Sequence, residues 1–166
     1  MLLTVYCPEC YAANNERDAV CGRCGAALNS DPRGDYADRL IWALNHPEPT
    51  VAPRAAWILG RRRDAKAVAP LIAVLESRKD MGVQEAAVVA LGQIGDPRAL
   101  PVLQKLLLDE ESYLSVRERA AWALGRIGDP SASAALREAV LDRSPAVRAA
   151  AAAALNLLTG QRVEPR

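Results

Sequence analysis

A short apolar pattern that begins with valine recurs four times in the last two thirds of the chain. The copies start at Val51, Val83, Val116 and Val147, at spacings of 32, 33 and 31 residues. Each copy has an alanine four residues after the valine and a leucine eight residues after it, which is the spacing of one face of an α-helix. A period of this length indicates a solenoid, in which stacked helix pairs bury apolar faces that no single pair can bury alone. Such an array exposes a long concave surface that suits a macromolecular partner. The repeat therefore argues against a conventional active-site pocket.

Between the valine segments, apolar residues four apart predict a second helix in each unit. They are Leu71 and Leu75, Leu103 and Leu107, and Leu136 and Val140. The connection Ile-Gly-Asp-Pro, at 94–97 and 127–130, explains the break between helices. Its glycine ends one helix in a left-handed conformation, its aspartate caps the next, and its proline occupies a first turn where no N–H is needed. With a leading helix near 35–45 and a closing helix near 145–158, the sequence predicts about eight helices.

Glycine follows the repeat valine by nine residues in three copies, at Gly60, Gly92 and Gly125. We expect these small residues to let neighbouring helices approach closely. Asn156 takes this place in the last copy.

Composition divides the chain near residue 34, because all four cysteines precede that point and the remainder is rich in Ala, Leu and Arg. We predict a cysteine module at 1–29, a linker at 30–34, a solenoid at 35–160 and a flexible tail at 161–166. The longest apolar run is far shorter than the roughly 20 residues that cross a bilayer, so no membrane association is expected. Without a recognisable targeting segment before Cys7, we expect a cytoplasmic protein with reduced thiols. The net charge of +1 demands neither nucleic acid nor a membrane as partner.

The four cysteines form two Cys-x-x-Cys pairs, Cys7 with Cys10 and Cys21 with Cys24, and ten residues separate the pairs. Two such turns facing each other present four thiolates in a tetrahedron, which suits one Zn²⁺. Four thiolates leave no open coordination position, so this zinc is expected to be structural. Two disulfides and a redox pair are the alternatives. The segment 5–28 resembles the small zinc-ribbon module found at the N-terminus of many prokaryotic proteins.

The repeat pattern, written VRxxAAxALGxIGDPxAxxxL, resembles the HEAT-like repeats first associated with phycobilisome lyases. The resemblance spans about residues 38–159 and implies an all-α solenoid of HEAT-like helix pairs, preceded here by the zinc ribbon. The first unit departs from the pattern, because Arg61, Arg62 and Arg63 stand where x-Ile-Gly is expected. We expect a looser or more exposed junction there.

Positions three, six and ten residues after each valine fall together on the side of the helix opposite the core. The resemblance implies that this side lines the concave groove, and Trp and Arg are enriched at binding hot spots. The expected partner-binding residues are Arg54, Trp57, Arg61, Val89, Gln93, Arg119, Trp122 and Arg126. The alternative is that both indoles fill gaps between units and the arginines only cover them.

Catalytic motifs find little support in the sequence. His46 is the only histidine, and the repeated His-Glu pairs through which HEAT-type hydroxylases bind iron do not occur. We therefore expect a non-enzymatic adaptor or scaffold that binds a protein or peptide in its groove. The alternatives are a nucleic-acid-associated factor, since arginine outnumbers lysine 18 to 3, and a protein that resembles a bilin lyase or assists one.

The closing helix carries small or apolar residues where its predecessors have Arg, Glu and Trp. They are Ala149, Ala150, Ala153 and Leu157. Because terminal units of a repeat array normally present a polar outer face, this end is a candidate contact surface for a second copy of the chain or for a partner. The alternative is that alanines expose too little apolar area to drive association.

Overall fold

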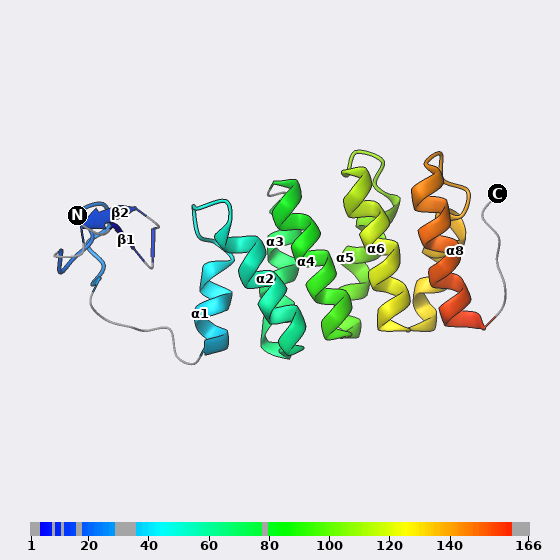
Figure 1. The fold of residues 1–166 in the computed structure, drawn as a ribbon, viewed down its shortest axis with the longest axis horizontal. Helices are drawn as coiled ribbons and strands as arrows, with labels where there is room; N and C mark the ends of the chain where they lie inside the picture. Colours follow the sequence, from blue (N-terminus) through cyan, green and yellow to red (C-terminus); the bar gives the residue numbers. More distant parts are fainter. Residues whose placement is uncertain are drawn as a thin grey trace.

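The computed structural model describes residues 4–7, 9–10, 12–15, 18–28, 36–77 and 80–160. These residues form a two-stranded sheet, eight α-helices and three short 3₁₀ turns (Figure 1). The predicted linker and tail lie outside the described residues, so the module boundaries remain a prediction.

The N-terminal module is built from two tight turns. Strands β1 (Thr4–Tyr6) and β2 (Ala13–Asn15) pair antiparallel and enclose the first cysteine pair between them. A bridge between Val20 and Ala27 closes the second turn around the other pair. Because each pair sits in its own closed turn, the fold can bring all four sulfurs together.

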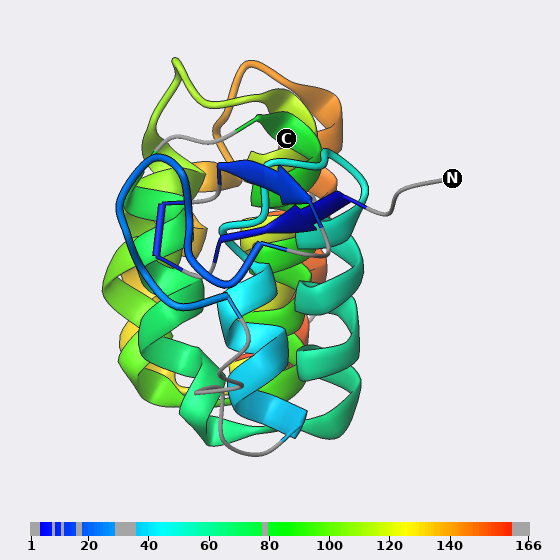
Figure 2. The ribbon, with the colours of Figure 1, turned by 90° about the vertical axis from the view of Figure 1, so that its left-hand side faces the viewer.

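The remainder of the described chain is a stack of helices in two layers. Their bounds are α1 (Tyr36–Ala43), α2 (Val51–Arg62), α3 (Val68–Glu76), α4 (Met81–Ile94), α5 (Leu100–Leu108), α6 (Leu114–Ile127), α7 (Ser133–Ala139) and α8 (Pro145–Thr159). The even-numbered helices lie side by side in sequence order as one layer, and α3, α5 and α7 pack behind them as the second (Figures 1 and 2). This arrangement confirms the predicted all-α solenoid of helix pairs.

The Ile-Gly-Asp-Pro connections behave as their residues predict. Gly95 and Gly128 end α4 and α6 with φ of 79° and 78°. The carboxylates of Asp96 and Asp129 accept backbone N–H groups two residues later, at 2.9 Å and 2.8 Å. They thereby cap the 3₁₀ turns η2 (Pro97–Ala99) and η3 (Pro130–Ala132), which lead into α5 and α7.

The connection that follows α2 differs from the Ile-Gly-Asp-Pro connections. Arg63 ends α2 with φ of 51°, the one non-glycine residue with positive φ in the described part of the chain. The turn η1 (Ala65–Ala67) follows, capped by Asp64 in the same way as its counterparts. The departure of the sequence from the repeat pattern is therefore absorbed by one residue in a left-handed conformation.

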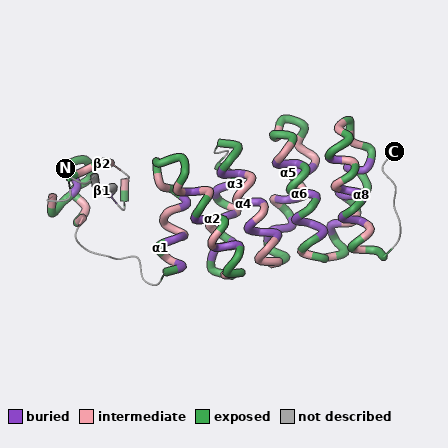
Figure 3. Tube along the Cα trace, in the orientation of Figure 1, coloured by how far each residue is buried: buried purple, intermediate pink, exposed green. Residues whose placement is uncertain are grey.

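The core lies between the two layers, where Figure 3 shows the buried stretches of the helices. The repeat alanines and leucines are buried in every unit. The three glycines that follow a repeat valine by nine residues sit where neighbouring even-numbered helices touch. A Cβ added to Gly60, Gly92 or Gly125 would lie 2.7–2.9 Å from the Cα of an alanine on the next helix. These contacts confirm that glycine permits the close approach.

Within the described ranges, no helix is long and apolar enough to cross a membrane.

Candidate functional site

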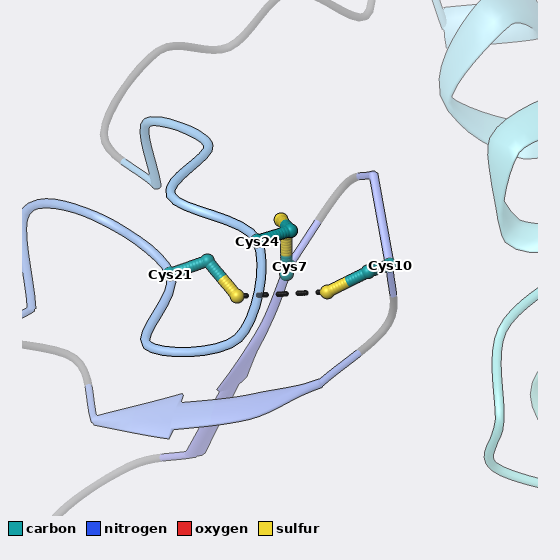
Figure 4. A group of neighbouring side chains, drawn as sticks. All are labelled: Cys7, Cys10, Cys21 and Cys24. Atoms are coloured by element: carbon teal, nitrogen blue, oxygen red, sulfur yellow. Dashed lines mark hydrogen bonds between the residues drawn. The ribbon is translucent and has the colours of Figure 1, made fainter.

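The four cysteines converge in the N-terminal module (Figure 4). Their sulfur atoms all lie within 4.8 Å of one another. Cys7 and Cys24 are 3.5 Å apart and Cys10 and Cys21 are 3.6 Å apart, sulfur to sulfur. A disulfide needs about 2.05 Å, so the four thiols are free.

This arrangement fits a tetrahedral metal ion. Four sulfurs at about 2.3 Å from zinc would be about 3.8 Å from one another, and the observed separations bracket that value. The backbone N–H groups of Glu9 and Arg23 each point at a cysteine sulfur, Cys7 and Cys21 respectively, at 3.4 Å. Such N–H groups favour the negative charge of a thiolate. The structure therefore shows a cluster that can hold a metal ion.

Hydrogen bonding makes the thiols unequal in acidity. The backbone N–H of Cys24 is the largest influence on Cys21 and lowers the pKa of that thiol to about 6. The N–H of Ala26 lowers the pKa of Cys24, but the thiols of Cys10 and Cys7 and the partial burial outweigh it and raise that pKa to about 12. Of these two thiols, Cys21 is therefore closer to its thiolate form at neutral pH, and the thiolate is the form that binds a metal ion.

The second candidate site is the exposed side of the even-numbered helices. We call it the even-helix face and define it by the positions three, six and ten residues after each repeat valine. Its residues are Arg54, Trp57 and Arg61 on α2, Ala86, Val89 and Gln93 on α4, Arg119, Trp122 and Arg126 on α6, and Ala150, Ala153 and Leu157 on α8.

Both tryptophans of this face are open to solvent. Trp57 is 52% exposed and Trp122 is 40% exposed. The guanidinium carbon of Arg61 lies 4.9 Å from the ring centre of Trp57, and that of Arg126 lies 5.9 Å from the ring centre of Trp122. Such contacts contribute about 0.5–1 kcal/mol each. They also hold the guanidinium groups in place on the surface.

Trp122 has a second role as well. Its Cζ3 atom lies 2.8 Å from the position that a Cβ on Gly92 would take. One edge of this indole therefore packs between α4 and α6, while the rest remains exposed. The exposed part agrees with the groove interpretation, and the packed edge agrees with the gap-filling alternative.

A hollow of about 400 Å³ surrounds Trp122 on the even-helix face. Val89 and Gln93 line one side of it, and Ala153 and Leu157 line the other. Its remaining walls include Glu118 and Ala154, which the sequence interpretation did not select. The hollow therefore joins four of the residues expected at the groove to the apolar positions of the closing helix.

A hollow of about 450 Å³ lies on the other layer, between α3, α5 and the start of α6. Lys105, Asp109 and Tyr113 are among its lining residues. The sequence interpretation missed it, because no repeat position marks these residues.

His46 holds a loop together and, within the described ranges, joins no metal-binding group. Its Nδ1 accepts the backbone N–H of Glu48 at 3.1 Å, and its ring packs edge-on against Trp42. Across the described part of the chain, the cysteine cluster is the group of His, Cys, Asp and Glu side chains placed to hold a metal ion.

Comparison with known families identifies the helical part. The family model described as HEAT repeats matches residues 37–115 and 111–165. The chain belongs to the HEAT-repeat family. Its predicted resemblance to the repeats of phycobilisome lyases is also confirmed, because 58 residues are 41% identical to the bilin biosynthesis protein PecE of Mastigocladus laminosus.

Two solved structures have the same arrangement of helices. Human deoxyhypusine hydroxylase in complex with glycerol matches with a TM-score of 0.68 and 26% identity over 81% of this chain and 48% of its own. The complex of CpcE and CpcF of the phycocyanin lyase from Nostoc sp. PCC7120 matches with a TM-score of 0.57 and 22% identity, over 80% of this chain and 68% of the matched one. The PecE match covers 35% of this chain and 22% of PecE. The chain thus spans about a fifth of PecE and about half of the hydroxylase.

These matches contradict the expectation of a non-enzyme. They are named as a bilin biosynthesis protein, a hydroxylase and a lyase complex, which are enzymes or components of enzymes. The expectation rested on the lack of catalytic motifs, and that lack does not separate an adaptor from a component of an enzyme.

Proposed function

We propose that this chain is a protein-binding subunit of an enzyme assembly of the bilin-lyase type. The similarity to PecE, together with the shared fold of the CpcE and CpcF complex, supports this class of assembly. The observation that carries the binding role is the pair of tryptophans, Trp57 and Trp122, which stand exposed under arginines on one face of the array.

The residues of the even-helix face suit a protein partner. Tryptophan and arginine supply most of the energy at protein interfaces when water is excluded around them. The hollow beside Trp122 offers room for an apolar side chain. We propose that the groove residues named from the sequence form this contact surface.

We also propose that the cysteine cluster binds one Zn²⁺. The residues that would hold it are Cys7, Cys10, Cys21 and Cys24, and the ion would supply stability to a module too small to fold by apolar burial alone. In this proposal the ribbon is a second docking surface, joined by the linker at 30–34 to the solenoid at 35–160.

The closing helix extends the contact surface. Leu157 is 71% exposed and Ala153 is exposed beside it. Asn156 stands where a glycine permits close packing between the other even-numbered helices. We propose that a partner protein or a second copy of the chain covers this end, at a wider spacing than between the other even-numbered helices because Asn156 replaces the glycine.

The test is binding to the phycocyanin polypeptide, with and without its bilin, measured by surface plasmon resonance. We expect the wild-type protein to bind at least one of the two forms. The double variant Trp57→Ala/Trp122→Ala should lose this binding while costing less stability than Leu91→Ala, because Leu91 is fully buried and its truncation costs about 2–5 kcal/mol. A folded wild-type protein that binds neither form would contradict the lyase-type assembly. A tryptophan variant less stable than Leu91→Ala would show that the indoles belong to the core.

A further inference from the structure

The pattern of residues on the even-helix face repeats at every second even-numbered helix. Trp57 on α2 and Trp122 on α6 each have an arginine three residues before and another four residues after. The next even-numbered helix in each case carries only uncharged residues at the matching positions. These residues are Ala86, Val89 and Gln93 on α4, and Ala150, Ala153 and Leu157 on α8. The face therefore consists of two copies of one unit, a helix with arginine and tryptophan at these positions followed by a helix with uncharged residues at them.

Most arginines of this face have no acidic partner in the part of the chain that the structure describes. Among the described residues, no carboxylate pairs with Arg54, Arg61 or Arg126, whereas Arg119 lies 3.7 Å from Glu85. Arg61 and Arg126 are held over the indole rings. A stacked guanidinium keeps its planar fork of donors oriented, and this fork matches the geometry of a carboxylate. The face thus presents positioned cations next to exposed indoles, with an apolar hollow beside Trp122.

We infer that the even-helix face binds a single acidic segment of a protein partner through two related subsites, one at Trp57 and one at Trp122. Each subsite takes one apolar side chain beside its tryptophan and one carboxylate at its arginines. This inference rests on the proposed function in one respect only, namely that the face binds protein.

The spacing of the helices fixes the spacing of the two anchors. Packed helices lie about 8–10 Å apart, and α4 separates α2 from α6, so the two subsites are about 16–20 Å apart. A helix rises about 1.5 Å per residue. Two apolar residues about 11 positions apart on one face of a helical segment would therefore reach both subsites.

The charge distribution favours an acidic peptide over a nucleic acid. The arginines stand on alternate helices, so they do not form the continuous positive track that a phosphate backbone follows. Glu85 and Glu118 add negative charge between them. Arg61 and Arg126 also lie over the ring faces on which a base would have to stack.

Three synthetic helical peptides test the inference by fluorescence anisotropy. The first is acidic with two leucines 11 residues apart, the second has one of these leucines replaced by alanine, and the third has lysine at every acidic position. We expect the two-anchor peptide to bind at least 10-fold more tightly than the one-anchor peptide, and the basic peptide to show no binding. Trp57→Ala and Trp122→Ala should each weaken the two-anchor peptide about 30-fold. The matched control is Tyr113→Ala, an equally exposed aromatic outside the face, which should leave all affinities unchanged.

Equal affinities for the two acidic peptides would overturn the two-subsite inference, as would binding of the basic peptide. Tighter binding of a 20-residue oligothymidine, with a steep loss at high salt, would replace it with nucleic-acid recognition.

The peptide series and the phycocyanin experiment distinguish failure of this inference from failure of the proposed function. The expected peptide order without phycocyanin binding would leave the inference standing and reject the lyase-type assembly. Phycocyanin binding that needs both tryptophans, with equal peptide affinities, would reject the inference alone.

Discussion

Arg63 has a backbone conformation that elsewhere in the array belongs to glycine. Its φ of 51° corresponds to 79° at Gly95 and 78° at Gly128. A residue with a Cβ is disfavoured in this region by about 1–2 kcal/mol. The arginine therefore costs stability at the junction that departs from the repeat pattern.

Replacing this residue tests the strain. Arg63→Gly should raise the free energy of unfolding by about 0.5–1 kcal/mol, because relief of the strain exceeds the extra entropy of glycine in the unfolded chain. The matched control is Arg62→Gly, which should lower it, because Arg62 is the last residue of α2 and its helical backbone has no such strain to relieve. Urea denaturation measures both changes. A loss of stability in Arg63→Gly would show that the left-handed turn carries no strain.

Gly125 tests the close contact between neighbouring helices. A Cβ at this position would lie 2.9 Å from both the Cα and the Cβ of Ala154 on α8. Gly125→Ala should therefore destabilise the protein by about 1–3 kcal/mol through overpacking. Gly82→Ala is the control, because a Cβ there would meet a carboxylate oxygen of Asp80 at 3.4 Å, which is ordinary van der Waals contact. That change should be stabilising by about 0.5–1 kcal/mol, and equal effects of the two substitutions would refute the contact.

At the scale of elements, a buried ion pair ties α6 to the turn before α8. Arg117 pairs with Asp142, and their side chains are 5% and 9% exposed. Arg117 also donates from Nε to the carbonyl oxygen of Leu107 at 3.1 Å. By contrast, the pair between Arg143 and Glu110 is largely exposed.

The two pairs predict different costs of truncation. Asp142→Ala should cost about 3 kcal/mol or more, because it leaves the Arg117 cation buried without its partner. Glu110→Ala should cost no more than about 0.5 kcal/mol, since exposed pairs contribute little. Thermal unfolding of the two variants side by side measures the difference. Similar melting temperatures would mean that water reaches Arg117.

The cysteine module and the solenoid have separate sources of stability. Purified protein should contain one Zn²⁺ per chain by metal analysis, and chelation should unfold residues 5–28 while the helical circular dichroism signal stays nearly unchanged. The reason is that a structural zinc ion contributes on the order of 10 kcal/mol to a small module, whereas apolar contacts hold the helices. Absence of zinc, or iron in its place, would reject the zinc assignment, and a loss of helical signal would show that the modules are coupled.

At the scale of the whole molecule, periodic features were predictable and contacts between distant residues were not. The repeat valines, alanines and leucines indicate helix pairs because their spacing matches the helical period, and the cysteine spacing likewise indicated the cluster. The double role of Trp122 depends on Gly92 of the preceding unit, which no local pattern shows. The hollow around Tyr113 joins residues of several elements without a common spacing. The expectation of a non-enzyme failed for a related reason, because a motif search detects catalytic groups and does not detect similarity to enzymes or their components.

Quantitative affinity capture from the native cell lysate tests the central claim most directly. Wild-type protein, Trp57→Ala/Trp122→Ala and Tyr113→Ala are compared by mass spectrometry of the bound proteins. We expect the wild type and Tyr113→Ala to retain the same component of a bilin-attaching enzyme or its protein substrate, and the double tryptophan variant to retain at least 10-fold less of it. Equal recovery by all three proteins, or recovery of proteins unrelated to bilin attachment, would contradict the account.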